Sequence, residues 1–167
     1  MTGKGTMEND RLAAEVLAAC RARRLKIAIA ESCTGGLVAA ALTSIAGSSD
    51  VVDRGFVVYA NEAKTELLGI PTEMLERTGA VSKEVVRAMA EGALAFSRAD
   101  LSVAVTGIAG PGGSTPEKPV GLVHFAVARR GSNTIHEYRI FTGDRRAVRE
   151  QSVAFALALL RRQALRP

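Results

Sequence analysis

Residues 25–45 read LKIAIAESCTGGLVAAALTSI, and this stretch decides the fold. Its first part, residues 25–30, is a short apolar run that predicts a buried strand, and its last part, residues 37–45, has apolar residues at helical spacing. Gly35 and Gly36 permit a tight turn between the two. The stretch therefore predicts a strand, a tight polar turn and a helix.

The rest of the chain continues this alternation of strands and helices. Apolar positions at helical spacing predict helices over residues 10–23, 62–68 and 82–98, and after Asp144. Apolar runs predict strands over residues 50–59 (interrupted at 54–55), 101–105, 120–128 and 134–141, the last two joined as a hairpin by residues 129–133. Residues 1–9 are expected to form a disordered N-terminal lead, and residues 10–167 a single domain. The pattern predicts an α/β fold, a layered sandwich with a mixed, mainly parallel sheet flanked by helices and a C-terminal β-hairpin plus helix.

Composition excludes several classes of protein. Cys20 and Cys33 do not form a C-x-x-C motif, and neither they nor the two histidines have the spacing of a zinc site. Residues 1–10 lack the apolar core of a signal peptide, and no run approaches the roughly 18 apolar residues of a membrane span. We therefore expect a cytoplasmic protein with reduced thiols, no metal, no cofactor and no membrane partner.

The formal charge of +5 leaves two interpretations open. Basic residues cluster at residues 21–24, 129–130, 145–149 and 161–166. Such scattered charge is typical of a solvated surface, but one or two of these residues also suffice for a basic pocket that binds an anionic small molecule.

The motif Glu31-Ser32-Cys33-Thr34-Gly35-Gly36 is the first candidate for chemistry. The predicted strand delivers Ser32 to the edge of the sheet at which open α/β folds bind ligands. Free main-chain amides at the start of the next helix could hold a phosphate or an oxyanion, so the residues from Cys33 to Gly36 are candidate substrate-binding residues. The alternative is that they only cap the helix. Cys33 is a rival nucleophile, but no histidine in the motif would activate it, and we interpret it as a small packed residue.

Lys64 is the candidate base. Asn61 is a good N-cap, which would place Lys64 at the third position of the predicted helix. A cation there meets the positive end of the helix dipole, so its charged form is disfavoured, and a neutral amine can accept a proton from a serine hydroxyl. The alternative is a surface lysine that pairs with Glu62 or Glu66.

Residues 107–119 contain four glycines and three prolines, which predicts a loop after a strand. The loop has neither the ending of a P-loop nor the spacing of a dinucleotide fingerprint. It suits either a flexible surface connection or the wall of a binding pocket, with Thr106, Gly107 and Gly110 as candidate substrate-binding residues. Arg145, at the start of the last helix, could hold a phosphate or pair with Asp144.

Several motifs together resemble one known family. They are AESCTGG at residues 30–36, AGSS at 46–49, RGFVVYANEAK at 54–64, GAVS at 79–82, GIAGP at 107–111 and KPVG at 118–121. In this order they resemble the CinA C-terminal domain family, over about residues 10–162.

The stand-alone members of this family resemble nicotinamide-nucleotide amidohydrolases. The resemblance implies hydrolysis of the carboxamide of nicotinamide mononucleotide (NMN) to nicotinate mononucleotide and ammonia, by a metal-free dyad of Ser32 and Lys64. It also implies that Tyr59, inside a matching motif, helps to orient the dyad. The implied partner is a small-molecule nucleotide, and Arg145 is our first candidate for binding its phosphate.

Three alternatives stay open. A catalytically inactive nucleotide sensor would keep the pocket without turnover, and a related enzyme could act on a different amide. A nucleic-acid-binding protein is suggested by the basic charge, but aromatic residues for stacking are few and no nucleic-acid motif is present. The scarcity of large core residues and the possible free edge of the hairpin lead us to expect a homo-oligomer.

Overall fold

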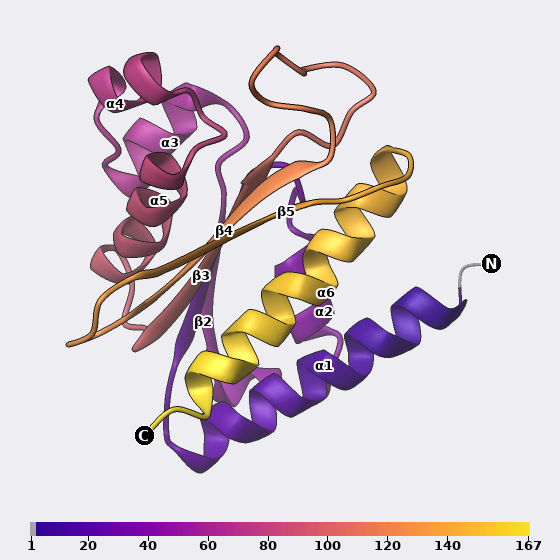
Figure 1. Cartoon of the computed structure of the whole chain (residues 1–167). Coiled ribbons are helices and arrows are strands. Elements are labelled where there is room, and N and C mark those ends of the chain that lie inside the picture. Colours follow the sequence, from indigo (N-terminus) through magenta and orange to yellow (C-terminus); the bar gives the residue numbers. More distant parts are fainter. Residues whose placement is uncertain (1–2) are drawn as a thin grey trace.

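The computed structural model describes residues 3–167, which form a five-stranded sheet with helices on both faces (Figure 1). The strands are β1 (Ile27–Glu31), β2 (Val52–Val57), β3 (Leu101–Gly107), β4 (Leu122–Arg129) and β5 (Ile135–Ile140), in the order β2-β1-β3-β4-β5. β1 pairs in parallel with β2 and β3, whereas β4 pairs antiparallel with β3 and β5. Only β4 therefore runs against the other strands, which confirms the mixed, mainly parallel sheet and the C-terminal hairpin.

The helices divide into two layers (Figure 1). One face of the sheet is covered by α1 (Gly3–Ala22), α2 (Leu37–Thr43) and α6 (Arg145–Ala164). The other face is covered by α3 (Asn61–Leu68), α4 (Thr72–Thr78) and α5 (Lys83–Ala95). Within residues 3–167, no helix is long and apolar enough to cross a membrane.

The central position of β1 decides where a site can form. The chain leaves β1 through α2 on one face to reach β2. It then passes through α3, α4 and α5 on the opposite face to reach β3, on the other side of β1. Open α/β sheets bind ligands beyond the carboxyl ends of the strands at such a reversal of strand order. Ser32 follows β1 at this point.

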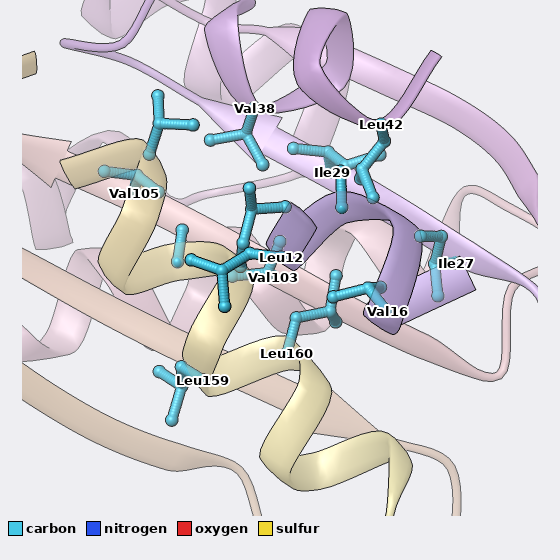
Figure 2. Close-up of a cluster of buried hydrophobic side chains, with 14 of the residues drawn as sticks. Leu12, Val16, Ile27, Ile29, Val38, Leu42, Val103, Val105, Leu159 and Leu160 are labelled. Atoms are coloured by element: carbon cyan, nitrogen blue, oxygen red, sulfur yellow. The ribbon is translucent and has the colours of Figure 1, made fainter. Parts of the chain in front are cut away.

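The larger hydrophobic core lies between the sheet and the layer of α1, α2 and α6 (Figure 2). Buried side chains from these helices meet alternate residues of β1 and β3, and Figure 2 labels Leu12, Val16, Ile27, Ile29, Val38, Leu42, Val103, Val105, Leu159 and Leu160. β1 is buried along its whole length and β3 along nearly all of it. Burial on both faces is expected for parallel strands that are covered by helices on each side.

The second core, under α5, is built from small side chains. Alanines of the sheet and of α5 pack in it, all of them buried: Ala28, Ala30, Ala104, Ala126, Ala90 and Ala93. Such small side chains allow α5 to lie close to the sheet. Gly92 extends this close packing to α3, because a Cβ added at Gly92 would lie 2.4 Å from the carbonyl oxygen of Leu68. α5 therefore supports the helix that carries Lys64.

α1 begins at Gly3 rather than near Asp10. Residues 3–9, for which we expected a disordered lead, are helical, and residues 1 and 2 lie outside the described part of the chain. Extending a helix that has already formed gains one hydrogen bond per residue at low cost, although these polar residues give no apolar periodicity. The added turns also lie beside α6, since Glu8 lines a small cavity together with Glu150.

Other elements also differ from expectation. α4 was not predicted, because seven residues are too few to show a helical period. β2 is continuous across residues 54–55, and its irregularity lies at Asp53, where the pairing with β1 shifts by one residue. α5 runs from Lys83 to Ala95, whereas the predicted helix covered residues 82–98, so its end lies three residues before Arg98.

The Gly92→Ala variant is expected to lower the free energy of unfolding by about 1–3 kcal/mol, because the new methyl group would push α5 away from Leu68. Urea denaturation measures this change. Gly112→Ala is the matched control: a Cβ at Gly112 would meet nothing within 4 Å, and we expect a change within about 0.5 kcal/mol. Equal effects of the two variants would contradict the close contact between α5 and α3.

Candidate active site

Ser32 is held between the ends of two strands. Its amide donates to the carbonyl oxygen of Val105 at 3.0 Å, on the β3 side. On the β2 side, the amide of Val58 donates to the carbonyl oxygen of Glu31 at 2.8 Å. These bonds extend the sheet to the position of Ser32, so its main chain is fixed. The residue is 9% exposed, and bulk water reaches little of it.

Lys64 reaches the same point from α3. The residue is 1% exposed. Its Nζ lies 3.2 Å from Ser32 Oγ, 2.9 Å from the carbonyl oxygen of Val58 and 3.1 Å from that of Tyr59. The structure therefore brings the predicted serine and lysine into hydrogen-bond contact, with main-chain oxygens from the segment after β2 as the other partners.

The surroundings of Lys64 favour its neutral amine. Burial lowers the pKa of Lys64 below the ordinary lysine value, because the charged form loses its hydration. A neutral amine has two N–H donors and one lone pair. When the carbonyl oxygens of Val58 and Tyr59 accept the two N–H groups, the lone pair faces Ser32 Oγ. An amine in this arrangement can accept the proton of the serine hydroxyl.

The start of α3 differs from expectation. Its N-cap is Ala60, which makes no side-chain cap, so Asn61 is the first helical residue and not the N-cap. Lys64 is consequently the fourth helical residue rather than the third. Burial is the leading cause of its lowered pKa. The same burial excludes the alternative of a surface lysine paired with Glu62 or Glu66.

Glu31 occupies the helix start that we expected to be free. Its two carboxylate oxygens accept hydrogen bonds from the amides of Val38, at 2.8 Å, and Ala39, at 3.1 Å, in the first turn of α2. Those two amides are thus unavailable to a substrate. Within residues 3–167, the amides of Thr34 and Gly36 donate to no other protein group, and they remain candidate donors to a ligand.

Cys33 is buried in the larger core. Burial is the main cause that raises the pKa of its thiol to about 12. The thiolate, which is the nucleophilic form, is therefore scarce at neutral pH. This environment favours our interpretation of Cys33 as a packed residue and Ser32 as the nucleophile.

The three predicted substrate-binding residues of the glycine-rich segment, Thr106, Gly107 and Gly110, lie in different environments. Thr106 is 1% exposed and donates its hydroxyl to the carbonyl oxygen of Ala80 at 3.0 Å, so this side chain ties β3 to the connection before α5. Gly107, the last residue of β3, lies too close to Val123 of β4 to accommodate a Cβ. Gly110 lies further along, and its carbonyl oxygen accepts a hydrogen bond from Arg145. Gly110 is therefore hydrogen-bonded to a second predicted site residue, Arg145.

Arg145 joins the loop to Tyr59. Its guanidinium donates to the carbonyl oxygen of Gly110 and to the hydroxyl of Tyr59, both at 3.0 Å. Asp144, the alternative partner of Arg145, instead caps α6 by accepting the amide of Ala147. Tyr59 thus links Lys64 to Arg145, since its carbonyl oxygen accepts from Lys64 and its hydroxyl accepts from Arg145.

A basic cavity of about 710 Å³ lies beside these residues. Its lining comes from the loop and from the start of α6: Ala109, Pro111, Val120, Gly143, Asp144, Arg145, Arg146 and Arg149. Neither member of the serine–lysine pair lines it. Arg149 connects the cavity to the turn after Ser32, because its guanidinium donates to the carbonyl oxygens of Cys33, at 3.1 Å, and Thr34, at 3.3 Å.

Sequence reasoning missed Glu31 and Arg149 as site residues. Arg149 follows Arg145 by four residues on α6, a spacing that places both on one helix face and that could have indicated the pair. Glu31 carried no comparable signal, because its contact with α2 depends on how the turn closes. No group of three histidine, cysteine, aspartate or glutamate side chains suited to a metal ion occurs among residues 3–167.

Comparison with known proteins gives one family and close relatives. The family model described as CinA C-terminal domain matches residues 9–164. The chain is 50% identical over 154 residues to an Escherichia coli K12 protein named nicotinamide-nucleotide amidohydrolase PncC, covering 92% of this chain and 93% of that one. It is 48% identical over 143 residues to a putative competence-damage inducible protein of Caldicellulosiruptor bescii. That match covers 86% of this chain but 34% of the relative, so the chain spans about a third of the longer relatives.

Solved structures share the fold. A crystal structure of the competence/damage inducible protein CihA from Agrobacterium tumefaciens superposes with a TM-score of 0.89 at 51% identity, covering 92% of this chain and 93% of that one. The competence damage-inducible protein A from Klebsiella pneumoniae gives a TM-score of 0.89 at 40% identity, covering 93% of this chain and 96% of that one. Both matches cover nearly the whole of each chain, so they show the fold of the whole domain.

The wild-type protein is expected to gain stability relative to Lys64→Met as the pH rises towards the unfolded pKa of lysine, about 10.4. Since the folded-state pKa of Lys64 is lowered, the unfolded chain binds more protons than the folded chain between that pKa and the unfolded value of about 10.4. Stability therefore rises with pH in this window. Urea unfolding of both proteins across the range measures the difference.

Lys26→Met, which removes an exposed lysine, is the control for the loss of one positive charge. A difference between wild type and Lys64→Met that stays constant with pH would contradict a lowered pKa for Lys64.

Proposed function

The chain belongs to the CinA C-terminal domain family, and from this premise we propose that it is an amidohydrolase that converts NMN to nicotinate mononucleotide and ammonia. The contact of 3.2 Å between Lys64 Nζ and Ser32 Oγ is the observation that carries the proposal. Relatives named nicotinamide-nucleotide amidohydrolase, about 50% identical over nearly their whole length, support the choice of substrate.

The first half of the reaction forms an ester. Neutral Lys64 takes the proton of Ser32 as the oxygen attacks the carboxamide carbon of the substrate. The resulting tetrahedral intermediate collapses when protonated Lys64 gives this proton to the departing nitrogen. Ammonia leaves, the nicotinoyl group remains bonded to Ser32 Oγ, and Lys64 is neutral again.

The second half of the reaction uses water. Lys64 takes a proton from a water molecule whose oxygen attacks the ester carbon, and the new intermediate expels Ser32 Oγ. Lys64 returns the proton to Ser32, and nicotinate mononucleotide leaves. Protons and atoms balance over the cycle with no redox change.

Negative charge develops on the carbonyl oxygen in both intermediates, and donors must face it. The amides of Thr34 and Gly36 are our candidates, since they donate to no other group within the described chain. The bond from Arg149 to the carbonyl oxygen of Cys33 holds the peptide unit that carries the Thr34 amide, and its bond to the carbonyl oxygen of Thr34 holds the next peptide unit of the turn. In this proposal Thr34 and Gly36 bind the oxyanion through their main-chain amides and not through side chains, whereas the amide of Gly35 donates to the carbonyl oxygen of Ser32 at 3.0 Å.

The basic cavity suits the phosphate of a mononucleotide. Arg145 and Arg149 line it, and a guanidinium can bind two phosphate oxygens at once. Arg145 also contacts Tyr59, whose carbonyl oxygen accepts a hydrogen bond from Lys64. Tyr59 therefore connects the residue that binds the phosphate to the residue that acts as the base.

Two broader inferences accompany this function. Cys20 and Cys33 are free and buried, which suits a cytoplasmic location. β5 is an edge strand on which Tyr138 is 55% and Ile140 58% exposed, and this apolar edge supports a homo-oligomer.

Ser32→Ala and Lys64→Met are each expected to lower ammonia release from NMN by about 10³-fold or more while the protein stays folded, because each removes one half of the proton transfer. A coupled ammonia assay, with circular dichroism to check folding, measures this. Cys33→Ala, which deletes only the neighbouring thiol, is expected to keep most of its turnover. Chelator should not change the rate, since the proposed steps use side chains of the chain itself.

Near wild-type turnover by Ser32→Ala would overturn the proposed nucleophile. A folded wild-type protein that binds NMN without releasing ammonia would instead identify a nucleotide sensor.

Arg145→Met is expected to raise KM for NMN by about 10–100-fold, the loss of about 1.5–3 kcal/mol from charged hydrogen bonds to phosphate. Nicotinamide riboside lacks the phosphate, so its kinetic constants should change far less. Steady-state kinetics on both substrates test this, with Arg11→Met on α1 as the control for charge. Equal effects on the two substrates would mean that Arg145 acts by positioning Ser32 and Lys64 rather than by binding the phosphate.

A further inference from the structure

Glu31 has a buried carboxylate that the proposed reaction does not use. The residue is 1% exposed, and its two oxygens accept the amides of Val38 and Ala39. Gly36, the N-cap of α2, provides no side-chain cap, so Glu31 caps this helix from the end of β1. A carboxylate that is bonded to two amides at a helix start is held there strongly.

These bonds enclose the nucleophile. Glu31 lies immediately before Ser32, whereas its side-chain partners lie beyond the turn of residues 32–36. The contact from Glu31 to α2 therefore closes this turn into a ring, and Ser32 is part of the ring. A cap made by Gly36 or by a side chain at that position would fix α2 but would leave the turn open.

The main chain of Glu31 is also connected to Lys64, the proposed base, through hydrogen bonds of Val58. Its carbonyl oxygen accepts the amide of Val58 at 2.8 Å, and the carbonyl oxygen of Val58 accepts Lys64 Nζ at 2.9 Å. One residue is thus bonded to α2 through its side chain, to the residue that holds Lys64 through its carbonyl group, and to Ser32 by a peptide bond.

We infer that Glu31 is a positioning residue, whose carboxylate closes the turn of residues 32–36 and so keeps Ser32 Oγ within hydrogen-bond distance of Lys64 Nζ. It does not touch the substrate. The inference rests on the proposed serine–lysine chemistry but not on the identity of the amide.

Glu31→Gln tests the inference with little change in size. The side-chain amide keeps one acceptor oxygen, but its NH₂ group would face a main-chain N–H, so one of the two bonds is lost. Misplacement of reacting groups by about 1 Å can cost about 10²-fold in rate. We expect kcat to fall by about 10–100-fold and KM to stay within about threefold of the wild-type value. A simple loss of stability would not give this separation when the assay is run well below the melting temperature.

Asp100→Asn is the matched control. Asp100 also accepts a main-chain amide with its carboxylate, that of Lys26 at 2.8 Å, but at the opposite end of β1. Kinetic constants close to wild type are expected for this variant. If Glu31→Gln does not fold, Glu31→Asp, which keeps the charge but shortens the side chain, takes its place with the same expected separation of kcat from KM.

A second measurement separates this inference from the choice of substrate. A fluorophosphonate probe phosphonylates activated serines: the serine oxygen bonds to phosphorus and fluoride leaves. Its rate of reaction with Ser32 can be measured without knowing the natural amide substrate. Glu31→Gln should react about 10–100-fold more slowly than wild type, and Asp100→Asn at the wild-type rate. If wild type reacts with the probe but does not hydrolyse NMN, only the proposed substrate fails. If folded Glu31→Gln reacts with the probe and turns over substrate at wild-type rates, the positioning role is overturned.

Discussion

The buried amine of Lys64 is the constraint on which the rest of the structure depends. A polar group without water needs partners at fixed positions, or its burial costs several kcal/mol. The partners of Nζ are Ser32 Oγ and the carbonyl oxygens of Val58 and Tyr59. They belong to the segments that follow β1 and β2, so these parallel strands must end side by side. Any packing that separated the two strand ends would leave the amine without its acceptors.

The two faces of the sheet meet this constraint in different ways. Large aliphatic side chains fill the core under α1, α2 and α6 (Figure 2). Alanines and Gly92 on the other face allow α5 to lie close to the sheet and to α3. α3 can therefore carry the long side chain of Lys64 to the ends of β1 and β2, although lysine is among the residues least often buried.

Much of the fold could be predicted from the chain because its signals are local. The strand, turn and helix of residues 25–45 and the hairpin of β4 and β5 follow from the spacing of apolar residues and from turn composition. Ser82 and Asp144 cap α5 and α6, as their positions indicated. The prediction that Asn61 is the N-cap of α3 was wrong. The preference of asparagine for the cap does not distinguish the cap position from the first helical position, where Asn61 lies. α4 is held by packing against α5, which a seven-residue pattern does not reveal.

By itself, the amino-acid sequence determined the alternation of strands and helices and the motifs that place Ser32 and Lys64 in a known family, because periodicity, capping and motif identity are properties of neighbouring residues. Only the tertiary structure decided that Lys64 is buried, that Glu31 closes the turn and that Arg149 reaches that turn from α6. The contact between Lys64 and Ser32 spans 32 residues, and that between Arg149 and Cys33 spans 116. Contacts at such separations depend on the strand order β2-β1-β3 and on the helix layers, which local preferences do not specify.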